Sequence, residues 1–231
     1  MTVLSVAKQV CRVIGLSEPD ILAASTERQY VELLGVLQEM AERIARGHDW
    51  QLFSRIETIT GDGSTEDFDL PSDYDRMRVK SQVWSASLET PLTPIPDPDQ
   101  WLGLDIQSFD FVINAWSIYG GQIHIKPALA TGVTAKYFYQ SNLIVAPSAG
   151  SNKTEFNADT DTFRLDEQLL KLGAIWRWKE SKGQPYAEEM ADYEELKARL
   201  VARDRGSRRV KVGKVRMPID AEAAYPQNVS P

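Results

Sequence analysis

The stretch DTDTFRLDEQLLKLGAIWRWKESKGQPYAEEMADYEELKARLVARDR, residues 159–205, decides the fold of this chain. Its first half places apolar residues at three- and four-residue steps, which is the spacing of one helix face: Leu165, Leu169, Leu172, Ile175 and Trp176. Thr162 or Asp166 can cap the start of this helix, and Gly183 can end it. Pro185 then suits the first turn of a second helix. The stretch therefore predicts two helices joined by a tight turn.

Two tryptophans in this hairpin lie only two residues apart, so they do not share a helix face. We expect Trp176 to fill the core and Trp178 to pack against a neighbouring domain or subunit, since large aromatic side chains bury area wherever they can.

Working outward, the N-terminal region has the same helical spacing in residues 3–14 and from about 26 to 46. From Trp50 to about Gln140 the pattern changes to alternation, with a hairpin signal at Gly120-Gly121. Within it, 71–75 reads as a turn, 79–84 as a strand and 99–102 as one short helical turn. Residues 142–159 are rich in Pro, Gly, Ser and Asn and predict a long exposed loop.

These patterns predict an α+β fold: a four-helix bundle with an inserted antiparallel β domain and an extended C-terminal arm. The predicted divisions are residues 1–49 for the first helical half, 50–160 for the β-rich insertion, 161–205 for the second helical half and 206–231 for the arm.

The composition is that of a globular protein, with 42% hydrophobic and 26% charged residues. The formal net charge of -7 argues against a generic nucleic-acid binder. The single cysteine, Cys11, excludes an internal disulfide, and we expect it in the core. We expect no secretory signal, since the N-terminus lacks a basic segment followed by an apolar run, and no membrane span, since no apolar run approaches ~18 residues.

Basic residues gather at the end of the predicted hairpin and beyond it. Residues 203–216 contain seven basic residues and one acidic residue, Asp204, so their formal charge is +6 and the rest of the chain carries -13. The seven basic residues are Arg203, Arg205, Arg208, Arg209, Lys211, Lys214 and Arg216. Charge blocks of this kind are often interaction tails, so we predict that these seven residues bind a partner. The alternative is a solvated, disordered terminus.

Catalytic chemistry is scarce. His48 and His124 have no second histidine or cysteine at metal-ligand spacing, so the sequence predicts no metal, no cofactor and no enzyme activity. Asp159, Asp161 and Asp166 could serve a cell-wall hydrolase, but helix capping explains them more simply. Five further acids read as exposed turn residues: Glu66, Asp67, Asp69, Asp73 and Asp75. A DNA-binding module that uses the basic arm is the other alternative.

Several segments together resemble one protein family. They are LPSDYDR at 70–76, GGQI at 120–123, YQSN at 139–142, FNADTDTF at 156–163 and LGAIWRWK at 172–179, with Lys182-Gly183 and Tyr186-Ala187. In order and spacing these segments are similar to those of the head-to-tail adaptor (connector) proteins of tailed bacteriophages, the tail tubular protein A group. The likeness covers about residues 1–203.

The resemblance implies a structural protein of the virion neck, made in the host bacterial cytoplasm. It implies a homo-oligomeric ring, commonly of twelve copies, beneath the portal protein. Such a ring would extend the channel for DNA ejection and give a platform for tail proteins such as a nozzle, a tail tube or a tail fibre or spike. Genomic DNA would pass without sequence-specific binding, and no membrane would be involved. The resemblance leaves open the ring number, the tail type and whether the arm docks on the portal or on a neighbouring adaptor subunit.

Overall fold

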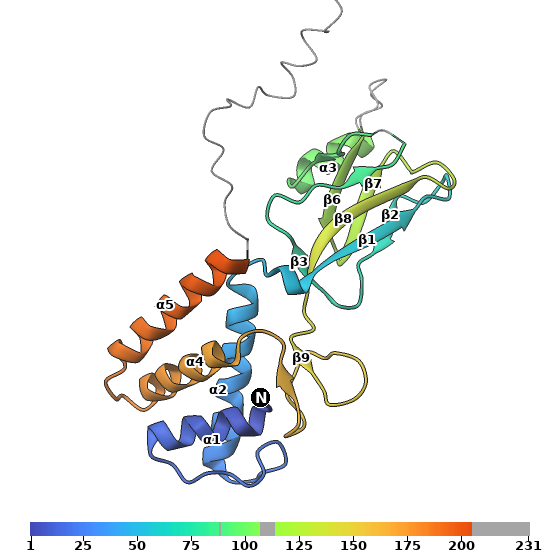
Figure 1. Cartoon of the computed structure of the whole chain (residues 1–231). Coiled ribbons are helices and arrows are strands. Elements are labelled where there is room, and N and C mark those ends of the chain that lie inside the picture. Colours follow the sequence, from blue (N-terminus) through green and yellow to red (C-terminus); the bar gives the residue numbers. More distant parts are fainter. Residues whose placement is uncertain (88, 107–113, 205–231) are drawn as a thin grey trace, which may run out of the picture.

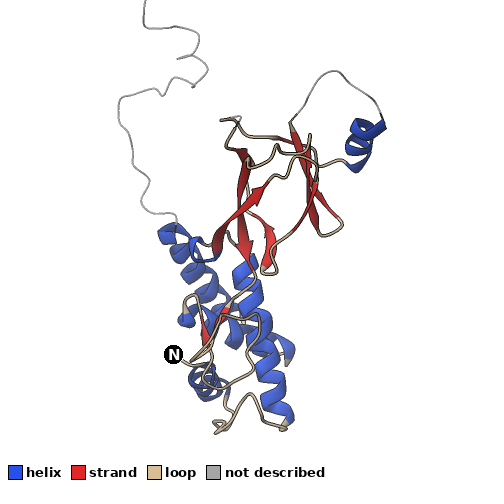
Figure 2. Ribbon diagram, turned by 90° about the vertical axis from the view of Figure 1, so that its right-hand side faces the viewer, coloured by secondary structure: helices blue, strands red, loops and turns tan. Residues whose placement is uncertain are grey.

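The computed structural model describes residues 1–87, 89–106 and 114–204, which form a helical part and a strand part lying end to end (Figure 1). The helical part comprises α1 (Val3–Ile14), α2 (Arg28–Arg46), α4 (Glu167–Ser181), α5 (Ala187–Asp204) and the short strands β9 (Val145–Ala146) and β10 (Thr162–Phe163). Figure 2 shows the same arrangement from the side, with the strand part beyond the end of α2.

The strand part begins after a short 3-10 turn, η1 (Gln51–Phe53), and its described residues form eight strands and one helix. These are β1 (Ser54–Thr60), β2 (Asp67–Asp69), β3 (Tyr74–Met77), β4 (Trp84–Ser85), β5 (Thr93–Pro94), α3 (Pro98–Ile106), β6 (Ala115–Tyr119), β7 (Gln122–Lys126) and β8 (Thr134–Ser141).

Helix α4 is the centre of the helical part, because α1, α2 and α5 all pack against it. Asp166 caps its start, accepting a hydrogen bond from Leu169 N at 2.9 Å. Gly173 of α4 faces side chains of both α2 and α5: a Cβ there would be 2.8 Å from Met40 Cε and 3.3 Å from Tyr193 Cε2. The shared core draws large side chains from all four helices, among them Val10, Leu37, Leu170, Trp176 and Tyr193. One hydrophobic core therefore unites the N-terminal and C-terminal helix pairs.

The strand part is a sandwich of two sheets. In the first, β8 pairs with β1 along one edge and with β3 and β4 along the other. The second has the order β2-β7-β6-β5, antiparallel except for the β5–β6 pair. Side chains of β7 and β8 fill the space between the sheets, including Ile123, Ile125, Tyr137 and Tyr139. The Gly120-Gly121 hairpin is confirmed, with φ of 61° and 82°.

The segment after β8 packs on the helices. Ile144, Val145 and Phe156 are buried in the helical core. Asp159 Oδ1 accepts hydrogen bonds from Leu22 N at 3.0 Å and Ala23 N at 2.7 Å, although these residues are more than 130 positions away in the sequence. The loop expected at 142–159 is present apart from the two-residue strand β9, and residues 148–151 are exposed. Its exposure elsewhere was wrongly expected, because Ile144, Val145 and Phe156 pack in the helical core and Asp159 binds the connection between α1 and α2.

The α+β class is confirmed, and so is the burial of Cys11 and Trp176. The four helices share a core, while their regular bundle geometry stays a prediction. Trp178 is also buried in this core, so the expectation that it packs on another domain or subunit was wrong. Because α1, α2 and α5 all pack on α4, side chains on different faces of α4, such as Trp176 and Trp178, are buried within the same molecule.

Three local expectations in the strand part were wrong in whole or in part. The turn predicted at 71–75 is present at its start, where Tyr74 N donates to the carbonyl of Pro71 at 2.9 Å, but Tyr74 and Asp75 belong to β3, which pairs with the end of β8. Val79 lies in a turn, and the strand predicted at 79–84 is only β4, which begins at Trp84. The single turn expected near Trp101 is the nine-residue helix α3.

Candidate partner interface at the junction of the two parts

The predicted basic arm starts at the junction between the helical part and the strand part. Arg203 is exposed in the last turn of α5. The other six predicted residues, Arg205, Arg208, Arg209, Lys211, Lys214 and Arg216, lie outside the described residues, so their role as partner-binding residues stays a prediction.

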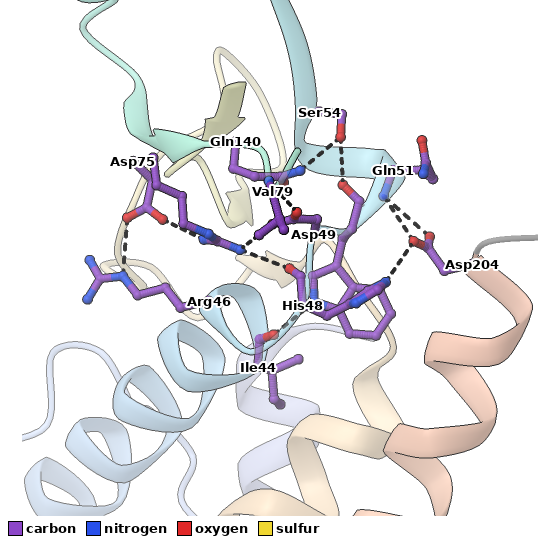
Figure 3. Close-up of polar contacts among 12 residues, drawn as sticks. Ile44, Arg46, His48, Asp49, Gln51, Ser54, Asp75, Val79, Gln140 and Asp204 are labelled. Carbon is purple, nitrogen blue, oxygen red and sulfur yellow. Dashed lines mark hydrogen bonds and ion pairs between the residues drawn. The ribbon is translucent and has the colours of Figure 1, made fainter. Parts of the chain in front are cut away.

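The end of α5 is tied to the start of the strand part. The Asp204 carboxylate accepts a hydrogen bond from Gln51 N at 3.1 Å, and its Oδ2 lies 3.4 Å from His48 Nε2 (Figure 3). His48 is buried, with its ring edge-on to Trp50 at 4.9 Å. Trp50 Nε1 donates to the carbonyl of Ile44 at 2.8 Å, which fixes the indole against the end of α2. The point from which the arm leaves is therefore held in place on the junction.

Arg76 on β3 is the second link across the junction. Its guanidinium donates to the carbonyl of His48 and to Asp49 Oδ1, both at 3.1 Å, and to Asp75 at 2.7 Å. Asp75 also pairs with Arg46 of α2 at 3.2 Å. The planar guanidinium can serve several acceptors at once, so one side chain connects the end of α2 to β3. We expect this network to fix the angle between the two parts.

Two of the junction acids had been expected to be exposed turn residues, but neither is exposed: Asp73 lies in a turn and is half-buried, and Asp75 is half-buried in β3. Asp75 joins Arg46 and Arg76, as described above. Asp73 accepts from the hydroxyl of Tyr139 at 2.7 Å and pairs with Arg55 at 3.3 Å. Burial opposes its ionisation, but these partners outweigh burial and lower the pKa of Asp73. Asp67 and Asp69 lie in β2. Apart from the adjacent Arg76, the partners of these two acids are 18 to 66 residues away, so sequence spacing gave no sign of those pairings.

A cavity of about 300 Å³ opens where the arm begins. Leu165, Leu169 and Leu200 form its apolar wall, and Arg203 and Asp204 stand at its edge. Leu52 of η1 also lines it and is half exposed.

The strand part carries an exposed apolar surface, which we call the outer sheet face and define by Ile56, Trp84 and Phe138. Ile56 and Phe138 are directly paired across β1 and β8, while Trp84 pairs with Lys136, two residues from Phe138. Paired residues and residues two apart on a strand point to the same side of a sheet. The three side chains are 58%, 50% and 43% exposed. They form an apolar surface on the side of this sheet that faces away from the sandwich core.

The three carboxylates that could have served a hydrolase have structural roles. Asp166 caps α4, and Asp159 accepts a hydrogen bond from the backbone of Leu22 in the connection between α1 and α2. Asp161 is fully buried and lies 2.7 Å from Lys153 Nζ, and its Oδ2 also accepts from the backbone of Asn157 and Ala158. Burial acts to raise the pKa of Asp161, but Lys153 and the two backbone N–H groups outweigh it and lower the pKa. Its side chain stabilises the turn that leads into β10.

His124 is held within the strand part. Its Nδ1 lies 2.6 Å from Asp67, its Nε2 lies 3.2 Å from the carbonyl of Tyr119, and its ring stacks on Tyr119 at 3.6 Å. Both ring nitrogens thus have protein partners. Among the described residues, no group of three or more His, Cys, Asp or Glu side chains is placed to hold a metal ion.

Within residues 1–87, 89–106 and 114–204, no helix has both the length and the apolar character needed to cross a membrane.

The chain is a mixed α+β protein whose two parts meet at an ion-paired junction, from which a basic segment continues. The family model described as SU10 adaptor protein matches residues 1–216. The chain therefore belongs to this family of bacteriophage head-to-tail adaptors and is a structural adaptor protein. No curated protein matches it.

Proposed function

We propose that this chain forms a ring at the phage neck, with twelve copies beneath the portal protein. In this role the ring extends the channel for genomic DNA and carries tail proteins. Membership of the adaptor family supports a place between head and tail. The elongated shape, with helices at one end and a sandwich at the other, supports the proposal because each end can face a different neighbour (Figure 1).

The observation that best supports a ring is the exposed apolar surface of the outer sheet face. A ring closes through heterologous contacts, which need two different surfaces on each subunit. Ile56, Trp84 and Phe138 offer one surface on the strand part, and the helical part offers the other. Large aromatic residues in the centre of such a patch contribute most of the energy of a contact.

The test is assembly on purified portal protein, followed by electron microscopy. Phe138→Glu places a charge at the centre of the outer sheet face, and we expect it to abolish rings on the portal. Leu102→Glu is the matched control, because Leu102 is 53% exposed on α3, away from this face. Normal rings with Phe138→Glu would refute the proposed contact, provided that the variant melts like the unaltered chain.

We further propose that the arm from Arg203 onward docks on the portal. An arginine guanidinium can donate two parallel hydrogen bonds to one carboxylate, so an arginine-rich arm can bind an acidic surface. Both hydrophobic cores are built from residues that precede Asp204. Deleting residues 206–231 is therefore expected to leave the melting temperature unchanged and to weaken attachment to the portal. A chain in which only Arg208, Arg209 and Lys211 are restored should regain part of that attachment.

Portal binding by the truncated chain as tight as that of the full chain would contradict the role of the arm. A DNA-binding role would give a different result: the full chain would bind duplex DNA with an affinity that falls steeply with salt, and the deletion would abolish that binding.

A further inference from the structure

The cavity of about 300 Å³ at the end of α5, which we call the α5 pocket, is open to solvent and apolar inside. Three leucines from three different segments line it: Leu52 of η1, Leu165 just before α4 and Leu200 of α5. Leu52 is half exposed, and Leu165 and Leu200 are partly exposed, so another molecule can reach their side chains. Exposed apolar side chains gathered around a hollow are typical of a contact site.

Two carboxylates stand at the rim of the α5 pocket. Asp166 Oδ1 accepts from Leu169 N at 2.9 Å as the cap of α4, and Asp204 accepts from Gln51 N at 3.1 Å. In the described part of the chain, neither carboxylate pairs with a lysine or an arginine. Arg203 lies at the same rim and is exposed. The rim thus carries two acidic groups and one basic group, and its net charge is negative.

The outer sheet face, defined above by Ile56, Trp84 and Phe138, carries the opposite charge. Lys136 pairs with Trp84 of β4 and lies two residues from Phe138 on β8, so its side chain is on the same side of the sheet. Lys136 is exposed and has no carboxylate partner among the described residues. The outer sheet face therefore offers apolar side chains and a positive charge, whereas the α5 pocket offers an apolar hollow and a negative charge.

We propose that the outer sheet face of one copy of this chain inserts an aromatic side chain, Phe138 or Trp84, into the α5 pocket of the next copy. This contact rests on the proposed ring and names its second surface. Burying the aromatic ring against Leu52 and its neighbours removes apolar area from water, and Lys136 then lies near the carboxylates of the rim.

The occupant is a second copy because identical subunits supply the two surfaces in equal numbers. The two surfaces share no residue, so each copy can give one contact and receive another, as a closed ring requires. Three apolar side chains and one pocket make a small contact. We therefore expect it to be weak in the free chain and to hold once the portal places the subunits side by side.

The test measures cross-linking between two full-length variants, each with one added cysteine. Thr58→Cys places a thiol on the outer sheet face beside Ile56, because Thr58 is exposed and pairs with Lys136. Arg203→Cys places a thiol at the rim of the α5 pocket. The native Cys11 is fully buried and does not compete. Equal amounts of the two variants are mixed without portal, and a short bis-maleimide is added.

We expect the mixed dimer to form about tenfold faster than with Leu102→Cys in place of Thr58→Cys, because a contact raises the effective concentration of the two thiols. Leu102 is the matched control, since it is 53% exposed on α3. Adding Phe138→Glu to the first variant, or Leu52→Glu to the second, should return the rate to that of the control. A rate equal to the control without these glutamates, or a rate that neither glutamate lowers, would overturn the contact.

A second measurement separates this contact from the proposed ring. A chain with both added cysteines is assembled on portal protein, imaged by electron microscopy and then cross-linked. We expect rings in the micrographs and a ladder of linked copies. Rings without a ladder would overturn the contact and leave the ring standing, whereas an absence of rings would overturn the ring itself. Cross-links from the α5 pocket to portal protein in place of a second copy would assign the pocket to the portal and overturn the contact.

Discussion

Replacing Trp176 tests the helical core most directly. The indole is 3% exposed and packs between Tyr186 and Tyr193, with ring centroids 6.3 Å and 5.9 Å away, while the Arg43 guanidinium lies 5.2 Å over its ring. Trp176→Ala removes all of these contacts and leaves a cavity. Substitutions of this kind lower the free energy of unfolding by about 3–5 kcal/mol, so we expect a loss in that range.

A second substitution at Trp176 separates packing from hydrogen bonding. The indole Nε1 is buried and has no acceptor in the described part of the chain. Trp176→Phe keeps an aromatic ring and removes this unsatisfied donor, so its cost should stay below about 1.5 kcal/mol.

The assay is equilibrium urea unfolding followed by far-ultraviolet circular dichroism at the helical band. The strand core does not contain Trp176, so the change should appear in the transition of the helices. The reasoning would be refuted by a loss under about 1 kcal/mol for Trp176→Ala, or by a phenylalanine variant as unstable as the alanine variant.

Three further predictions address other parts of the molecule. Gly61→Ala should lower the stability of the strand part by about 1–3 kcal/mol in urea unfolding followed at the strand band of the circular dichroism spectrum, because its methyl would overlap the Leu129 backbone and reach within 2.7 Å of the Ala130 carbonyl oxygen. A neutral effect would contradict this packing. The pKa of Asp161 is lower in the folded state than in the unfolded state, so its contribution to stability is present above about pH 4 and is lost as the pH falls through the folded-state pKa. Asp161→Asn should therefore destabilise the chain at pH 7 and flatten its acid melting curve. An acid melting curve unchanged in slope would count against this. The isolated chain should be largely monomeric, because the outer sheet face has only three large apolar side chains, and a stable ring seen by mass photometry without portal would disprove this.

The local elements of this fold were predictable because their signals are local. Apolar spacing placed α1 and α2 within two residues of their observed bounds. It also located α4, whose start had been left open between Thr162 and Asp166, and glycine marked the hairpin at Gly120-Gly121. Helical periodicity also identified Trp176 as a core residue. These features depend on interactions between residues close in sequence or on one buried helix face, so they can be recognised from the pattern of a single sequence.

The sequence also determined the chemistry available at the C-terminal end. The seven basic residues from Arg203 onward were visible as a charge block, and the motif order indicated the adaptor family. What such a block binds is a property of the surface that it meets, and no local pattern encodes that surface.

Only the tertiary structure decided the junction. Arg46 and Asp75 are 29 residues apart, Gln51 and Asp204 are 153 apart, and Leu22 and Asp159 are 137 apart. Each acid looks like an ordinary turn or capping residue in sequence, because a carboxylate gives the same local signal whether it faces water or an arginine. The folding of distant segments onto one another selects the partner, and so the junction and its cavity emerge only when both cores have formed.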